Sequence, residues 1–97
     1  MTGGELTAAE AFGSLVYELR EDAYLTQAQL AAELGVSQAA ISRWEHGRFL
    51  PNHAALGTLV RFGPGYGDEL LDLWRRGRWD LYHKKQLAKL PKGGGGE

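Results

Sequence analysis

Residues 26–47 read TQAQLAAELGVSQAAISRWEHG, and this stretch says most about the fold. Thr26 and Gln29 have the S/T-x-x-Q spacing of a capping box, so we expect a helix to begin just after Thr26. Gly35 can adopt the left-handed conformation that ends a helix. Ser37 is then in place to cap a second helix. The stretch therefore predicts two short helices joined by a tight turn.

The apolar residues of this stretch recur at the spacing that gives each helix one buried side. Ala31 provides a small side chain where two crossing helices come closest. The residues expected to be buried are Leu30, Leu34, Val36, Ile41 and Trp44. The opposite side of the second helix is then left free, and it carries Gln38, Ala39, Ser42 and Arg43.

Similar signals predict helices on both sides of this pair. A second capping box, Thr7 to Glu10, precedes apolar residues at three-four spacing, which predicts a helix over about residues 8–22. Pro51 and Asn52 restart the chain before a helix over about 53–62.

The last part of the chain is expected to form two more helical segments. Asp68 can cap one of them, and Leu70, Leu71 and Trp74 give it an inner face. Gly77 is expected to interrupt this helix, and a final helix is expected over about 78–90, ended by Pro91. Because no segment alternates with the period of a strand, the fold class is all-α, with five to six helices.

The composition limits the class of protein. A chain of 97 residues favours one domain, and 43% hydrophobic residues exclude a wholly disordered chain. No apolar run is long enough for a membrane span, and the start lacks the pattern of a signal peptide. Cysteine is absent, which excludes disulfides and thiolate metal sites. We therefore expect a cytoplasmic protein.

The net charge of −1 hides an asymmetry along the chain. Residues 1–74 hold four basic and ten acidic side chains, a sum of −6, whereas residues 75–97 hold seven basic and two acidic, a sum of +5. An acidic body repels nucleic acid unless its basic groups gather on one face.

The stretch quoted above, together with its flanking residues, resembles the sequences of the XRE family, the phage repressor and Cro-like helix-turn-helix proteins. The resemblance covers about residues 12–62. It rests on Leu19-Arg20, on Leu25-Thr26-Gln27, and on the run Ile41-Ser42-Arg43-Trp44-Glu45-His46-Gly47-Arg48 followed by Pro51. A weaker resemblance of GDELLDLWRRG points to actinobacterial members.

The resemblance implies a role for particular residues. The second helix of the pair would lie in the major groove of double-stranded DNA, where Arg43 would reach guanine and Gln38 adenine, or either would reach a phosphate. Ala39 stands where many relatives have a polar base-reading residue, and it can still touch a thymine methyl group. The DNA-binding residues expected on this basis are Gln27, Ser37, Gln38, Ala39, Ser42, Arg43 and Arg48. Arg20 and Glu45 match a pair that forms a buried structural salt bridge.

Together these observations divide the chain into four parts. We expect a flexible N-terminus over residues 1–7, a helix-turn-helix domain over 8–76, a basic aromatic helical extension over 77–91, and a flexible Gly-rich tail over 92–97. Trp74, Trp79 and Tyr82 could either close the core or form an exposed patch.

Other chemistry is not expected. The three histidines lack metal-ligand spacing, the loop at residues 63–67 lacks the features of a phosphate loop, and no catalytic triad pattern occurs. We therefore expect no enzyme activity, no catalytic residues, no metal and no cofactor.

Two functions remain. The first is a sequence-specific DNA-binding transcriptional regulator, a repressor acting as a homodimer. The second is a protein-interaction module that would use the acidic face of the first helix and the aromatic, basic residues 74–90. The −6 body favours the second function, and the helix-turn-helix pattern favours the first.

Overall fold

The structure is a computed structural model that describes the backbone of residues 6–89 and the side chains of residues 6–83. Residues 1–5 of the expected flexible start, Pro91 and the expected tail over residues 92–97 lie outside the described part. The α-helices are α1 (Ala8–Asp22), α2 (Gln27–Leu34), α3 (Gln38–Glu45), α4 (His53–Phe62) and α5 (Gly67–Lys89). A short 3-10 turn, η1 (Pro64–Tyr66), joins α4 to α5. The expected all-α class is confirmed, because the described residues contain no strand.

The predicted caps of α1, α2 and α3 form where the sequence places them, whereas the predicted cap Asp68 lies inside the first turn of α5. Thr7 and Thr26 each complete a capping box, in which the hydroxyl accepts from the third helical N–H and that residue's side chain accepts in return. Gly35 ends α2 in the left-handed conformation, with φ at 71°. Local hydrogen bonds therefore fix the bounds of α1 and α2 before tertiary packing is considered.

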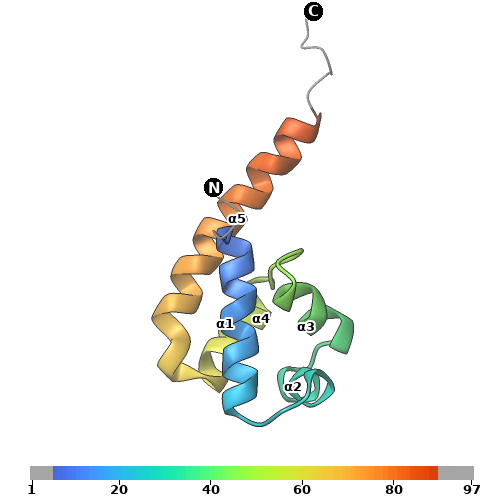
Figure 1. The fold of residues 1–97 in the computed structure, drawn as a ribbon, viewed down its shortest axis with the longest axis vertical. Helices are drawn as coiled ribbons and strands as arrows, with labels where there is room; N and C mark the ends of the chain where they lie inside the picture. Colours follow the sequence, from blue (N-terminus) through green and yellow to red (C-terminus); the bar gives the residue numbers. More distant parts are fainter. Residues whose placement is uncertain (1–5, 90–97) are drawn as a thin grey trace, which may run out of the picture.

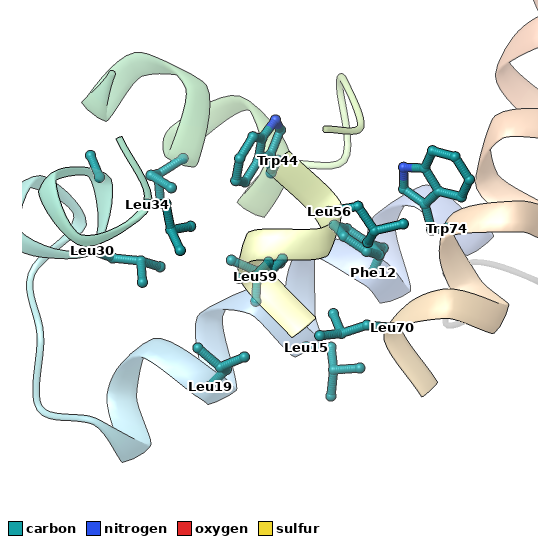
Figure 2. Close-up of a cluster of buried hydrophobic side chains, with 13 residues drawn as sticks. Phe12, Leu15, Leu19, Leu30, Leu34, Trp44, Leu56, Leu59, Leu70 and Trp74 are labelled. Carbon is teal, nitrogen blue, oxygen red and sulfur yellow. The ribbon is translucent and has the colours of Figure 1, made fainter. Parts of the chain in front are cut away.

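The helices surround one apolar core, to which all five α-helices contribute (Figure 2). Phe12, Leu30, Ile41, Leu59 and Leu70 are fully buried, and each comes from a different helix. Trp44 and Trp74 are buried as well, and Trp74 Nε1 donates to the carbonyl of Pro51 at 2.7 Å. The core packs α1 between α3 on one side and α5 on the other (Figure 1).

The prediction that Gly77 interrupts the last helix was wrong. Helix α5 is continuous from Gly67 to Lys89 and replaces the two predicted helices. Gly77 is buried against α1, and a Cβ there would lie 3.2 Å from the Ala9 nitrogen and 3.0 Å from Leu50 Cδ1. The glycine thus permits a close approach between helices and does not end one.

Of the three aromatic residues that could either close the core or form an exposed patch, one is buried and two are exposed. Trp74 belongs to the core, whereas Trp79 is 63% exposed and Tyr82 57% exposed. Within residues 6–89, every helix is too short or too polar to serve as a membrane span.

Candidate nucleic-acid interface

Helix α3 is held on one side and free on the other. Ser37 caps it by accepting from the Ala40 N–H at 3.1 Å. Ile41 and Trp44 bury the inner side of the helix. At about 100° per residue, the residues of the opposite side fall within an arc of about 140°. They are Gln38, Ala39, Ser42 and Arg43, of which Ser42 is half-buried and the others are exposed.

A buried ion pair fixes the position of α3 on α1. Arg20 Nε donates to Glu45 Oε2 at 2.7 Å, and Arg20 Nη2 donates to Glu45 Oε1 at 3.2 Å. The side chains of Arg20 and Glu45 are 11% and 7% exposed. The hydrogen bond to Glu45 raises the pKa of Arg20 above its ordinary value. This bidentate geometry holds the end of α3 in one orientation.

The same ion pair is tied to the entry of α2. Arg20 Nη1 donates to the carbonyl of Leu25 at 2.9 Å. Gln27 Nε2 donates to Glu45 Oε1 at 2.9 Å. Gln27 is the first residue of α2, so its amide joins α2 to α3 near the helix N-terminus, where an anion is favoured. No spacing signal reveals the contact between Gln27 and Glu45, because it depends on how the two helices cross.

The turn after α3 brings further residues to this side. Gly47 has a φ of 73°, and the Arg48 N–H donates to the Arg43 carbonyl at 3.0 Å. The chain therefore folds back, and the Arg43 guanidinium lies 5.7 Å from the centroid of the Phe49 ring. Phe49 is 58% exposed, so its ring faces solvent beside the arginine. The sequence offered no signal for this cation–π contact.

Gly13 is a second residue whose role the sequence does not reveal. It is buried in the middle of α1 against the end of α3. A Cβ at this position would overlap the Trp44 carbonyl oxygen and lie 2.7 Å from the Glu45 carbonyl oxygen. Only a glycine lets α3 come this close to α1. The signal was a single small residue inside an otherwise regular apolar pattern.

The charges of α3 and its turn are arranged unlike those of the whole body. Glu45 is the single carboxylate of α3, and it is paired with Arg20 on the inner side. Arg43 and Arg48 are exposed. The outer side of this segment is therefore locally basic, although residues 1–74 sum to −6.

Comparison with known proteins agrees with this geometry. Residues 16–62 match the helix-turn-helix family model. A curated relative, the HTH-type transcriptional activator BcrR of Enterococcus faecalis, is 43% identical over 60 residues. That alignment covers 62% of this chain and 29% of the relative, so the chain spans less than a third of that protein's length. No solved structure gives a significant match. The matched segment, the two capped helices and the free face of the second support the predicted resemblance of residues 16–62 to helix-turn-helix domains of the XRE family.

Proposed function

We propose that the protein is a sequence-specific DNA-binding transcriptional regulator that places α3 in the major groove of double-stranded DNA. The observation that carries this proposal is the free face of α3, with exposed Gln38, Ala39 and Arg43, above an inner side that the core and the ion pair hold rigidly. A rigid helix with polar side chains on one face is what direct readout of base edges needs.

Each side chain has a contact that suits its chemistry. Arg43 donates to guanine O6 and N7, Gln38 bonds adenine N6 and N7, and Ala39 touches a thymine methyl group. Ser42 lies between them on the same face and contributes a hydroxyl.

The remaining residues contact the DNA backbone. Gln27 and Ser37 stand at the N-terminal ends of α2 and α3, where backbone N–H groups attract phosphate. Arg48 follows α3 and reaches the phosphate on the far side of the groove. Because these contacts carry no sequence information, their loss weakens binding to all sequences alike.

The DNA-binding unit comprises residues 8–76, and residues 77–91 extend it. It acts as a homodimer on a pseudo-palindrome with half-sites about 34 Å apart, one helical turn of DNA. Two copies double the few basic contacts that each monomer provides. Repression by occluding a promoter needs no further surface, although the relative from Enterococcus faecalis is named an activator.

The test is selection of bound sites from a random duplex library at low and near-physiological salt. We expect enrichment of one inverted repeat, and a log–log slope of affinity against salt of about −0.9 for each phosphate contacted. Two reporters, with the enriched site overlapping the promoter in one and upstream of the promoter in the other, distinguish repression from activation. Failure to enrich any sequence at either salt would overturn the proposal.

A further inference from the structure

Helix α5 continues past the body of the molecule (Figure 1). Its Gly77 lies against Ala9, and α1 begins at Ala8. Helix α5 then continues to Lys89, beyond the N-terminal end of α1. Most helical stability in proteins comes from packing of an amphipathic face, so a segment that projects past the body gains stability from a partner.

The projecting segment carries an uncovered aromatic stripe. Trp79 and Tyr82 are three residues apart and more than half exposed, and the exposed Leu71 lies near the same side of the helix. The Trp79 ring contacts the His83 ring of the same helix at 4.1 Å between centroids. Exposed apolar side chains gathered in this way mark a contact surface.

The charges of α5 are segregated along its length. The first turns carry Asp68, Glu69 and Asp72, and the rest carries Arg75, Arg76 and Arg78 with one acid, Asp80. The sequence adds Lys84, Lys85 and Lys89 to the same basic end, although their side chains lie outside the described part. The helix is therefore acidic at its start and basic at its end.

Such a helix is complementary to itself in only one direction. In an antiparallel pair, the acidic start of one copy lies opposite the basic end of the other, whereas a parallel pair aligns like charges. A twofold axis generates the antiparallel pair from two identical chains. Within its own chain Arg76 pairs with Asp72, and Arg78 lies over the Trp74 ring. Arg75 is therefore the described arginine of α5 left to stack on an aromatic ring of the other helix.

We propose that a second copy of this chain covers the stripe, so that two α5 helices pack antiparallel along Leu71, Trp79 and Tyr82. This interface extends the homodimer of the proposed function. The pairing can be measured without DNA, so its failure is distinguishable from a failure of DNA binding.

The test is sedimentation equilibrium of the full chain with a set of charge reversals. D68K/D72K and K85E/K89E each place like charges opposite one another, and the twofold axis doubles the effect. We expect each pair of reversals to weaken the dimer by about tenfold. The combined variant D68K/D72K/K85E/K89E restores opposite charges and the original net charge, so we expect its dimer within about threefold of the original.

Two further variants complete the experiment. E18K/E33K changes net charge as much as D68K/D72K but lies on α1 and α2, and it should leave the dimer unchanged. W79A/Y82A should give a monomer whose circular dichroism still shows the folded body.

Three results would overturn the proposal. The first is a chain that is monomeric at all concentrations. The second is a dimer that no α5 reversal affects, which would place the interface elsewhere. The third is an unchanged dimer whose DNA affinity falls in K85E/K89E and rises in D68K/D72K, which would make the basic end a contact for DNA phosphates.

Discussion

Helix α1 contacts α3 on one side and α5 on the other. In each contact, a glycine lies where the two helices come closest. At Gly13 a Cβ would overlap backbone carbonyls at the end of α3, which cannot move without shifting that helix. At Gly77 a Cβ would lie 3.0 Å from Leu50 Cδ1, the end of a flexible side chain, and 3.2 Å from the backbone nitrogen of Ala9, so the overlap is smaller than at Gly13. A side chain at Gly13 would therefore force α3 away from α1, whereas a side chain at Gly77 would require a shift of only a few tenths of an ångström.

The polar contacts on the two sides differ in the same way. A buried, bidentate ion pair with Gln27 attached joins α1 to α3. On the α5 side, the polar contacts among the described residues are an exposed hydrogen bond from the Tyr66 hydroxyl to Asp22 of α1 and a bond from Trp74 to the carbonyl of Pro51, in the loop before α4. A buried ion pair thus sets the orientation of α3, the helix proposed to read DNA, whereas α5 is held on α1 mainly by apolar packing.

The largest effect is expected from Arg20→Ala. This substitution leaves the Glu45 carboxylate buried without its cation, which costs about 3–5 kcal/mol of unfolding free energy. Trp74→Phe, which removes the bond from α5 to the loop before α4, leaves the Pro51 carbonyl unpaired at a cost of about 1–3 kcal/mol. Urea denaturation measures both values.

DNA affinity separates the two variants further. Measured at a temperature where both are folded, affinity should fall in Arg20→Ala and stay unchanged in Trp74→Phe. Equal losses of affinity in the two variants would contradict the idea that the α1–α3 side alone positions α3.

The next effect compares Gly13→Ala with Gly77→Ala. Overpacking against backbone should cost Gly13→Ala about 2–3 kcal/mol. At Gly77 the Leu50 side chain can move, and the Ala9 backbone must shift by only a few tenths of an ångström. The helix propensity of alanine, worth about 1 kcal/mol, offsets this strain, so the net change should stay within about 1 kcal/mol. Thermal unfolding of the two variants measures both losses of stability. A larger loss in Gly77→Ala than in Gly13→Ala would show that α5 is packed more closely on α1 than α3 is.

A smaller effect is expected at Phe49, whose ring lies beside the Arg43 guanidinium. Phe49→Ala should lower affinity for a specific site by about twofold to fivefold, because an exposed cation–π contact contributes about 0.5–1 kcal/mol. Phe49→Tyr keeps an aromatic face and should bind as the original protein does. If Phe49→Leu binds equally well, apolar contact and not the π face accounts for the role of this residue.

Local signals predicted most of the helix-turn-helix region. The capping boxes at Thr7 and Thr26 and the left-handed Gly35 act within a few residues, so the sequence alone indicates where α1 and α2 begin and where α2 ends. The features that sequence reasoning missed depend on segments that meet in space. Gly77 has the local appearance of a helix break, and only its approach to Ala9 gives it another role.

In the candidate site, too, local patterns were predictable and contacts between segments were not. The periodic spacing of Ile41 and Trp44 indicated which face of α3 is free. The bond from Gln27 to Glu45 and the stacking of Arg43 on Phe49 join residues from different elements, and no periodic pattern encodes them.

The most direct test of the proposed DNA readout is the binding of Arg43→Ala to an enriched duplex and to its single-base variants. Arg61→Ala, which removes one exposed arginine from α4, controls for net charge. We predict that Arg43→Ala loses about 1–3 kcal/mol on the enriched site and loses its preference at one base position, while Arg61→Ala keeps that preference. If Arg43→Ala instead discriminates every base as the original protein does, Arg43 does not read the DNA sequence.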